Sequence, residues 1–365
     1  MKHIDIARII EEKAPLVYAE EWDNPGFQFG APDDEVKKIL VALDFNDKVL
    51  HEAVEKGANL IITHHPFLFK ATKKITTDSA DMALIIEALK NNITLYSAHT
   101  NLDNAFHGLN YYVASLLGLH SLEALQPCNN VLYKIVTFVP SEAVKKVESA
   151  IFKAGAGAIG NYDCCSFKLP GTGSFRAMEG ANPYVGNIGE IHLEDEVRIE
   201  VTVPEHLKKN VVDSIVKNHP YEEPVYDVYR IDNPLKTTGS GVVGLLDTPI
   251  DEQSFLQLVH DKLAVQCLRY SNLTGKTIKK VALCTGAGAF LINRATSLHC
   301  DAFITGDVRH HEFYVDKDLL LVDAGHFETE IPSSQWFIDT ITAKLGNIDI
   351  HRADTADNHI HVWKR

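Results

Sequence analysis

Short apolar runs alternate with amphipathic stretches along the first third of the chain. A run such as KKILVALD is apolar at consecutive positions, which is the pattern of a strand buried on both faces. The following stretch, KVLHEAVEKGAN, is apolar at helical spacing and ends near Gly57. This order predicts strands at 37–44, 60–66 and 93–100 and helices at 48–59, 78–92 and 105–119. Strands that alternate with helices favour parallel pairing through crossover connections.

The last third of the chain repeats this order. It predicts strands at 278–288, at 319–330 and, running into a loop, at 301–313, and helices at 290–300 and 333–345. The segment NLIITHH aligns with DAFITGD, and YSAHTNLD aligns with DAGHFETE. In the second pair a strand ends at a histidine and a carboxylate follows four residues later, His99 with Asp103 and His326 with Glu330. The repeat predicts two related α/β halves.

The middle of the chain, residues 128–235, has a different pattern. A strand, a Val-Pro corner and a helix occur at 133–155 and again at 198–220, and a last strand is expected at 222–231. We expect Ser141 to cap the first of these helices. Two such units with intervening strands predict a ferredoxin-like α+β domain.

The Gly- and Pro-rich segment 168–187 is expected to be a long mobile loop within this middle region. The predicted fold is therefore α/β. Residues 1–127 and 236–365 would be two related halves of one domain, and residues 128–235 would be a smaller domain inserted between them.

Composition and charge limit the classes of function. The 365 residues are 45% hydrophobic and 23% charged, which is ordinary for a globular protein. The net charge is −14 and no basic stripe stands out, which disfavours binding to duplex nucleic acid. No apolar run is long enough to span a bilayer, and the N-terminal stretch, with its acidic residues, is not a signal peptide. The six cysteines have no CxxC spacing, so we expect reduced thiols and a cytoplasmic protein.

Histidines and carboxylates gather where the predicted strands end. In open α/β sheets, ligands bind beyond the carboxyl ends of the strands. Five residues at these ends are of types that bind metal ions well: His64, His65, Asp103, His326 and Glu330.

The adjacent residues His64 and His65 suit two ions better than one. Neighbouring side chains of a regular strand point to opposite faces, but at a strand end, with Pro66 forcing an extended turn, both rings can lean over the sheet edge. Asp103 and Glu330 could bridge two ions about 3.5–4 Å apart. A ligand set without thiolate fits zinc, the ion we favour, or manganese or iron at a centre open to water. It argues against a closed structural zinc site.

Simpler interpretations remain for several of these residues. A histidine pair can belong to a helix edge or a solvated loop, but three His/carboxylate clusters at strand ends favour the metal centre. His99 and Asp307 are candidates for proton transfer; His99 could equally be a core histidine, and Asp307, with His310 and His311, could lie at an exposed helix start. The turn TGAGAF at 285–290 could hold an anion or could be only a tight turn.

The chain resembles the Nif-three-like proteins, also described as type-two homologues of GTP cyclohydrolase one. The motifs that carry the resemblance span the chain in order: EEWDNPGFQFG, THHPFLF, SAHTNLD, TGDVRHH and GHFETE. The resemblance implies a dinuclear metal centre with His64, His65, Asp103, His326 and Glu330 as ligands. It also implies a toroidal homohexamer with metal sites facing an inner cavity. In longer members an inserted domain similar to PII and CutA proteins occurs, which would correspond here to residues 128–235.

Two functional hypotheses follow. The leading one is a hydrolase with two divalent ions, in which a metal-activated water attacks an anionic small molecule such as a nucleotide or another phosphorylated compound. Opening of the purine ring of GTP needs the same activated water, so the cyclohydrolase label is chemically compatible with this centre. The alternative is a regulatory or metal-storage protein whose inserted domain senses a metabolite.

Overall fold

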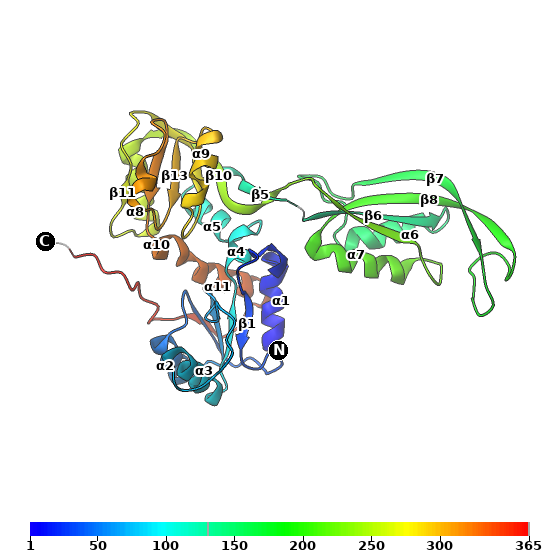
Figure 1. The fold of residues 1–365 in the computed structure, drawn as a ribbon, viewed down its shortest axis with the longest axis horizontal. Coiled ribbons are helices and arrows are strands. Elements are labelled where there is room, and N and C mark those ends of the chain that lie inside the picture. Colours follow the sequence, from blue (N-terminus) through cyan, green and yellow to red (C-terminus); the bar gives the residue numbers. More distant parts are fainter. Residues whose placement is uncertain (130, 364–365) are drawn as a thin grey trace. The chain divides into compact units, whose positions relative to one another are not determined.

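The computed structural model describes residues 1–129 and 131–363 (Figure 1). The chain divides into two compact units. The larger unit combines Met1–Pro127 with Lys236–Arg365, and the smaller one is Cys128–Leu235. The larger unit is thus built from two segments that lie far apart in the sequence.

The first sheet of the larger unit has the strand order β1-β4-β3-β2-β15. The strands are β1 (Gly26–Phe29), β2 (Ile39–Ala42), β3 (Leu60–Thr63), β4 (Thr94–Ser97) and β15 (Ile350–Arg352). β15, β2, β3 and β4 are parallel, and β1 pairs antiparallel with β4 at the edge. Every residue of β2, β3 and β4 is buried, as expected for parallel strands covered on both faces.

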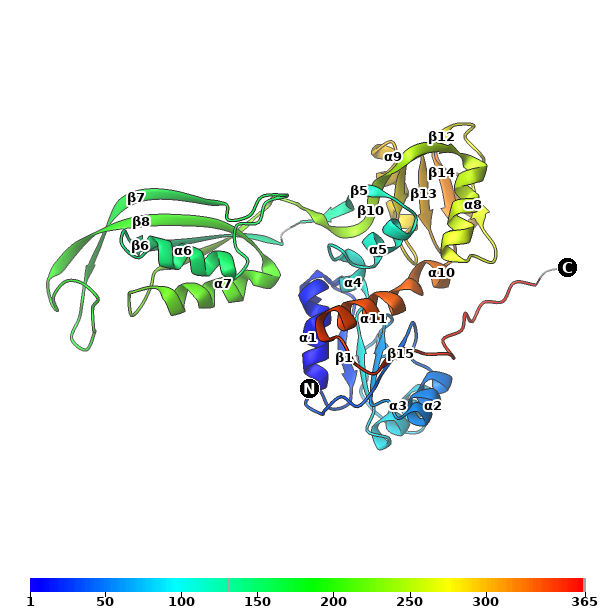
Figure 2. The same ribbon diagram turned by 180° about the vertical axis from the view of Figure 1, so that it is seen from behind.

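Helices surround this sheet and supply its core. They are α1 (His3–Lys13), η1 (Leu16–Tyr18), α2 (Asp47–Lys56), α3 (Ala80–Lys90), α4 (Thr100–Asn104), α5 (Leu109–Leu116) and α11 (Pro332–Leu345). The expected helix before Gly57 is confirmed as α2. It begins after Asn46, whose side chain accepts a hydrogen bond from the Val49 N–H, and it ends at Gly57, where φ is 71°. α11 packs against α1 and against β15, as Figure 2 shows from behind.

The second sheet of the larger unit has the order β11-β14-β13-β12-β10-β5. Its strands are β5 (His120–Cys128), β10 (Leu235–Asp251), β11 (Arg269–Tyr270), β12 (Thr277–Leu283), β13 (Ala302–Thr305) and β14 (Leu320–Asp323). The helices of this region are α8 (Glu252–Leu263), η2 (Ala289–Leu291), α9 (Ile292–Ser297), η3 (His310–Phe313) and α10 (His326–Glu330). β12, β13 and β14 are parallel, whereas β10 and β11 pair antiparallel with their neighbours.

The expected internal repeat is visible in the strand order of the two sheets. The series β1-β4-β3-β2 in one corresponds to β11-β14-β13-β12 in the other, with an antiparallel strand at the same edge of each. The repeat does not separate cleanly along the chain, however. β5 comes from the first third and joins the second sheet, and β15 comes from the last third and joins the first sheet. Each half of the chain thus contributes one strand to the sheet of the other half.

The smaller unit contains one antiparallel sheet and two helices. Its elements are β6 (Leu132–Pro140), α6 (Val144–Lys153), β7 (Ser166–Arg176), β8 (Ile191–Pro204), α7 (Glu205–Asn218) and β9 (Tyr226–Ile231). The strand order is β7-β8-β6-β9, and the succession along the chain is that of a split β-α-β unit. Ile135, Ile199, Val201, Val211 and Ile215 belong to its buried core.

One local prediction in this unit was partly wrong and another was wrong. In the expected loop at 168–187, residues 168–176 belong to β7, which pairs with β8 from Ser166 to Arg176, and 177–187 lie outside the named strands. β7 lies at the edge of its sheet, where Pro170 removes a donor that no neighbouring strand needs. Ser141 does not cap α6. The N-cap residue is Ala143, and the Ser141 hydroxyl lies instead 3.5 Å from the carbonyl of Asp195.

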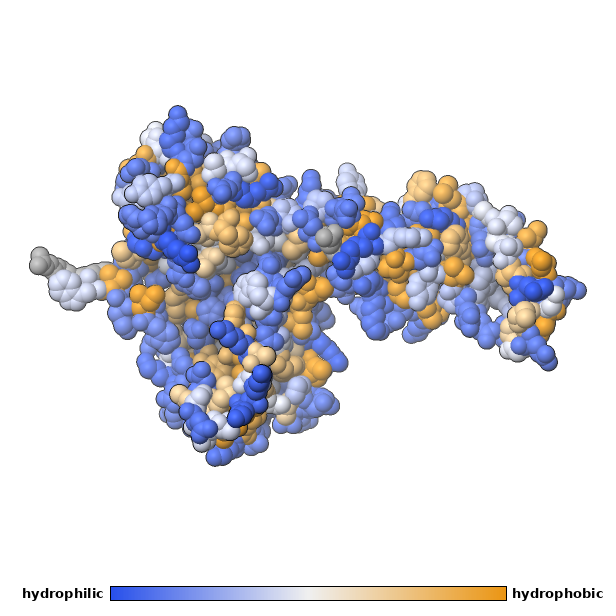
Figure 3. Space-filling model, in the orientation of Figure 1, coloured by the Kyte–Doolittle hydropathy of each residue, from blue (hydrophilic) through white to orange (hydrophobic). Residues whose placement is uncertain are grey.

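Among the described residues, no helix is both long enough and apolar enough to cross a membrane. On the face drawn in Figure 3, hydrophilic side chains are spread over both units, and hydrophobic side chains are scattered among the hydrophilic ones. The described cysteines form no disulfide.

Candidate metal centre

His64 and His65 directly follow β3, and both rings are fixed by a hydrogen bond at Nδ1. His64 Nδ1 donates to the carbonyl oxygen of Ala98 at 2.9 Å, and His65 Nδ1 donates to the Asp44 carboxylate at 2.7 Å. The two ring centroids are 5.2 Å apart. Because the strand ends at Thr63, the alternation of faces stops and both rings serve the same edge of the sheet.

Two more histidines sit at the starts of short helices that follow β4 and β14. His99 immediately precedes α4, and its Nδ1 donates to Asp23 at 2.8 Å. His326 is the first residue of α10, and its Nδ1 donates to Asp307 at 2.7 Å. A carboxylate follows each histidine by four residues, one turn further along, where it lies on the same side of the helix.

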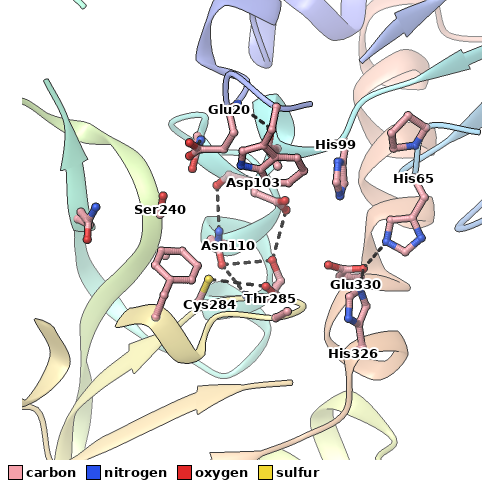
Figure 4. Close-up of a pocket in the computed structure, with 18 of the residues that line it drawn as sticks. Glu20, His65, His99, Asp103, Asn110, Ser240, Cys284, Thr285, His326 and Glu330 are labelled. Carbon is pink, nitrogen blue, oxygen red and sulfur yellow. Dashed lines mark hydrogen bonds and ion pairs between the residues drawn. The ribbon is translucent and has the colours of Figure 1, made fainter. Parts of the chain in front are cut away.

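The imidazoles gather around the carboxylates, and Figure 4 shows His65, His99 and His326 on the same side of the cavity as Glu330. Glu330 Oε2 lies 2.8 Å from His65 Nε2 and 2.9 Å from His326 Nε2. Glu330 Oε1 lies 3.8 Å from His64 Nε2, and Asp103 Oδ1 lies 3.6 Å from the same atom. Side chains from the ends of both sheets therefore meet in one cluster.

The donor set fits divalent metal ions. His64 Nε2 is buried and has no hydrogen-bond partner among the described residues, although two carboxylates lie nearby. Such an orphaned nitrogen is expected where an ion completes the site. Each imidazole uses Nδ1 for an oxygen acceptor, which leaves Nε2 for the centre, as is usual for histidines that bind metals. Two sets of donor atoms are close enough to hold an ion: His64, His65 and His99, and His65, His326 and Glu330.

The cluster requires positive charge beside Glu330. Burial alone would lower the pKa of His65, but hydrogen bonds to Asp44 and Glu330 outweigh it and raise the pKa to about 10. The same balance, with hydrogen bonds to Glu330 and Asp307, raises the pKa of His326 to about 9. Burial opposes the charge of Glu330, yet the imidazoles around it hold its pKa well below the usual range. Protonated imidazoles can supply that positive charge, and so can bound metal ions.

Gly286 leaves space beside the cluster. A Cβ at this position would lie 2.0 Å from Glu330 Oε1 and 3.4 Å from His326 Nε2. The residue also has a φ of +60°, a conformation that side chains disfavour. Both facts require glycine at this wall of the centre.

The turn at 285–290 is a tight turn. The N–H of Gly286 donates to Thr329 Oγ1 at 3.0 Å, and the N–H of Gly288 donates to Thr305 Oγ1 at 2.8 Å. Because the protein itself uses these two donors, the anion-binding interpretation loses its main support.

A cavity of about 660 Å³ adjoins the cluster, within the size range of small-molecule sites. His65, His99, Asp103, His326 and Glu330 line one side of it. In Figure 4, Ser240 on β10 lies on the opposite side from the imidazoles. A small molecule in the cavity would therefore reach the candidate metal centre directly.

The structure brings together all five residues that the sequence analysis selected as ligands, with His99 beside them. Asp307 is not part of the cluster itself and contacts it through His326. His310 and His311 lie on η3, where their rings are 5.4 Å apart, and they do not line the cavity.

Sequence reasoning missed the roles of Asp23 and Asp44. The Asp23 side chain is fully buried, and it accepts hydrogen bonds from His99 and from the Thr100 N–H. Burial opposes its charge, but these hydrogen bonds lower its pKa to about 2. Asp23 lies 76 residues from His99 in the sequence, so no local spacing signals the pair. The one sequence signal for Asp23 was its position in the motif EEWDNPGFQFG.

Curated proteins from two bacteria are similar to this chain over most of its length. A protein of Bacillus subtilis named GTP cyclohydrolase 1 type 2 homolog is 38% identical over 329 residues, covering 89% of this chain and 88% of that protein. A Listeria monocytogenes protein of the same name is 36% identical over 322 residues, covering 87% and 86%.

Solved structures and a family model are also similar to the whole chain or nearly all of it. The crystal structure of a Bacillus cereus protein related to NIF3 superposes with a TM-score of 0.85 at 36% identity, covering 99% of each chain. The Staphylococcus aureus protein SA1388 superposes with a TM-score of 0.75 at 27% identity, covering 100% of this chain and 99% of that one. A family model described as Duf34/NIF3 (NGG1p interacting factor 3) matches residues 1–359. The chain therefore belongs to the DUF34/NIF3 family.

Proposed function

We propose that the cluster holds two divalent metal ions and that the protein is a metal-dependent hydrolase acting on a small molecule bound in the adjoining cavity. The observation that carries this proposal is that each of four imidazoles is fixed at Nδ1 by an oxygen acceptor. Nε2 of three of them, His64, His65 and His326, lies within 3.8 Å of a carboxylate oxygen of Glu330. A purely structural histidine cluster would not need four separate oxygen acceptors to aim it.

In this proposal Glu330 would help to hold both ions. Its Oε1 lies on the side of His64 and Asp103, and its Oε2 lies on the side of His65 and His326. His64 and Asp103 would then bind one ion, and His65 and His326 would bind the other. Zinc is the ion we favour, with manganese or iron as the alternatives that a His/carboxylate set also suits.

Two divalent ions in this centre would supply an acidified water and positive charge against the developing negative charge of the substrate. The chain's own residues fix the geometry. Asp44, Asp23 and Asp307 hold three of the imidazoles, and Asp307 acts as a positioning residue. His99 faces the cavity with the buried Asp23 behind it, which suits it to accept and return a proton.

The metal proposal is tested by the metal content of untagged protein after loading and removal of free ions. We expect two ions per chain in the wild type, a loss of one in His326→Ala and a loss of both in Glu330→Gln. His51→Ala is the matched control, because His51 is an exposed histidine of α2 outside the cluster. Fewer than one ion per chain in the loaded wild type would contradict the dinuclear centre.

The hydrolase proposal is tested with the same loaded protein on a panel of amides, cyclic ureides, nucleosides, nucleotides and phosphoesters. We expect turnover of at least one compound and a loss of about 100-fold or more in His99→Ala with both ions retained. Full metal loading without turnover on any compound would overturn the enzyme and favour the regulatory or metal-storage alternative. Loss of an ion in His99→Ala would make His99 a ligand instead of a proton carrier.

We further propose that residues 128–235 are an inserted domain of the PII/CutA type, and that 1–127 and 236–365 together form the metal-binding domain. The β-α-β-β-α-β succession of the smaller unit supports this. The family resemblance supports assembly into a homohexamer. Light scattering on the eluting protein measures the mass, and a monomeric mass at micromolar concentration would contradict the assembly.

A further inference from the structure

Large aromatic side chains line the cavity, two of them, Trp22 and Phe69, with ring centroids about 6 Å from that of His99. Trp22, Phe69 and Phe290 line it and are 58%, 46% and 65% exposed. Trp22 and Phe69 contact each other, with ring centroids 5.6 Å apart. Three exposed aromatic side chains at one cavity indicate a surface for an apolar or aromatic ligand.

The charge of the cavity wall argues against a polyphosphate. Neither lysine nor arginine occurs among the described residues that line it. The carboxylate of Glu20 lines it in addition to those of Asp103 and Glu330. Two metal ions would compensate one anionic group at the cluster. A triphosphate would then leave most of its charge beside Glu20 with no cation to pair it.

The same walls offer polar groups suited to the edge of a heterocycle. The amide of Gln126 and the hydroxyl of Ser240 have no hydrogen-bond partner among the described residues. Glu20 receives a hydrogen bond at Oε1 from Asn104 at 3.1 Å, which leaves Oε2 available to accept from an amino group. Donors and acceptors are thus both present, opposite or beside aromatic surface.

Resting on the proposed metal centre, we infer that the cavity binds an uncharged planar heteroaromatic ring, of the nucleobase or nucleoside class, and discriminates against nucleoside triphosphates. The ring lies against the aromatic wall, and its polar edge faces Gln126, Ser240 or Glu20. This replaces the anionic substrate that the metal charge alone suggested with an uncharged one, because no lysine or arginine lines the cavity to pair with a polyphosphate.

Calorimetric titration of the metal-loaded full-length protein with the four ribonucleosides and their triphosphates tests this inference. We expect at least one nucleoside to bind with a dissociation constant below about 1 mM, and its triphosphate to bind at least about tenfold more weakly. A triphosphate that binds as tightly as its nucleoside, or the absence of binding by all four nucleosides, would overturn the inference.

Variants of the aromatic wall give a second measurement. Phe290→Ala and Trp22→Ala should each weaken nucleoside binding by about tenfold, the usual effect of removing a stacking partner. Tyr314→Ala and Trp363→Ala are the matched controls, because these exposed aromatic residues do not line the cavity. They should leave binding unchanged. Equal effects of control and wall variants would contradict the assigned contact.

Metal content, measured on the same samples, separates this inference from the proposed function. If the protein holds two ions per chain but binds no nucleoside, the ring-binding inference would be wrong and the proposed metal centre would stand. If the protein binds a nucleoside but cannot be loaded with metal ions, the proposed metal centre would be wrong and the proposed ring-binding site would stand.

Discussion

At the residue scale, the turn after β3 explains how adjacent histidines share one centre. The hydroxyl of Thr63 donates to the carbonyl oxygen of His65 at 2.8 Å, and Ser97 Oγ donates to the same oxygen at 3.2 Å. These bonds fix the backbone as it leaves the strand. His64 then turns inward, fully buried, while His65 remains partly exposed at the cavity. One residue is thus placed for each half of the cluster.

The raised pKa values of His65 and His326 predict proton release when metal binds. With pKa values of about 10 and about 9, both imidazoles carry protons at pH 7 in the metal-free protein. Imidazole must lose its proton to bind a metal ion. We expect at least two protons released per chain at pH 7, and an apparent metal affinity that rises with pH up to about 10. Calorimetry in buffers of different ionisation enthalpy measures the release.

His326→Ala serves as the control for this prediction and should release about one proton fewer. Binding heats that do not depend on the buffer, in the wild type, would show that both imidazoles are already neutral and would contradict the prediction.

At the element scale, the same local arrangement of strand, histidine, helical turn and carboxylate occurs twice. A parallel strand ends, a histidine begins or precedes a single helical turn, and a carboxylate follows four residues later, in α4 and in α10. The repeat differs at the neighbouring strand. Where β3 is followed by His64 and His65, β13 is followed by Gly306 and Asp307. Gly306 packs against the backbone of α10, where a Cβ would lie 2.7 Å from the N–H nitrogen of His326. The repeat therefore yields one cluster and not two.

Glu52 of α2 binds the chain just after the short strand β15. The Glu52 carboxylate accepts hydrogen bonds from the backbone of Asp354 and Thr355, from the Thr355 hydroxyl and from Lys56. Burial opposes its charge, but these bonds lower its pKa to about 2. We expect Glu52→Gln to lower the free energy of unfolding by roughly 2–3 kcal/mol at pH 7. Urea denaturation measures this loss.

The pH dependence follows from the sign of the shift. A lowered carboxyl pKa stabilises the folded protein above the unfolded value of about 4.5 and loses that contribution as the pH falls towards 2. The difference between wild type and Glu52→Gln should therefore shrink below pH 4. Glu55→Gln, on the exposed side of the same helix, should match the wild type. A difference that stays constant with pH would contradict the assignment to this carboxylate.

At the scale of the whole molecule, the cluster joins the two sheets of the larger unit. His64, His65, His99 and Asp103 come from the ends of the first sheet, and His326 and Glu330 come from the end of the second. None of them belongs to the smaller unit. Bound metal should therefore stabilise the larger unit alone.

Calorimetric unfolding can test this separation. We expect two transitions, of which only the one from the larger unit moves upward when zinc is added. Ligand at 1,000 times its dissociation constant adds about 4 kcal/mol, which is on the order of 10 °C for a unit of this size. Glu330→Gln should remove the shift. A parallel shift of both transitions, or of neither, would contradict a centre confined to the larger unit.

The sequence by itself determined the local elements and the chemistry of the candidate site. The buried parallel strands β2 to β4 and β12 to β14 were readable because consecutive apolar residues mark strands covered on both faces. The five candidate ligands were readable because parallel strands end at one edge of a sheet. These are local signals that need only a few neighbouring residues.

The tertiary structure decided which distant segments meet. The exchange of β5 and β15 between the sheets, the pairing of β7 in a Gly- and Pro-rich stretch, and the Asp23–His99 pair all depend on partners far along the chain. Three residues such as Ile350–Arg352 carry too little pattern to name the strand beside them. Likewise, the sequence does not show which oxygen acceptor will bind Nδ1 of each imidazole. Only the folded chain sets those distances, and the orientation of the whole cluster follows from them.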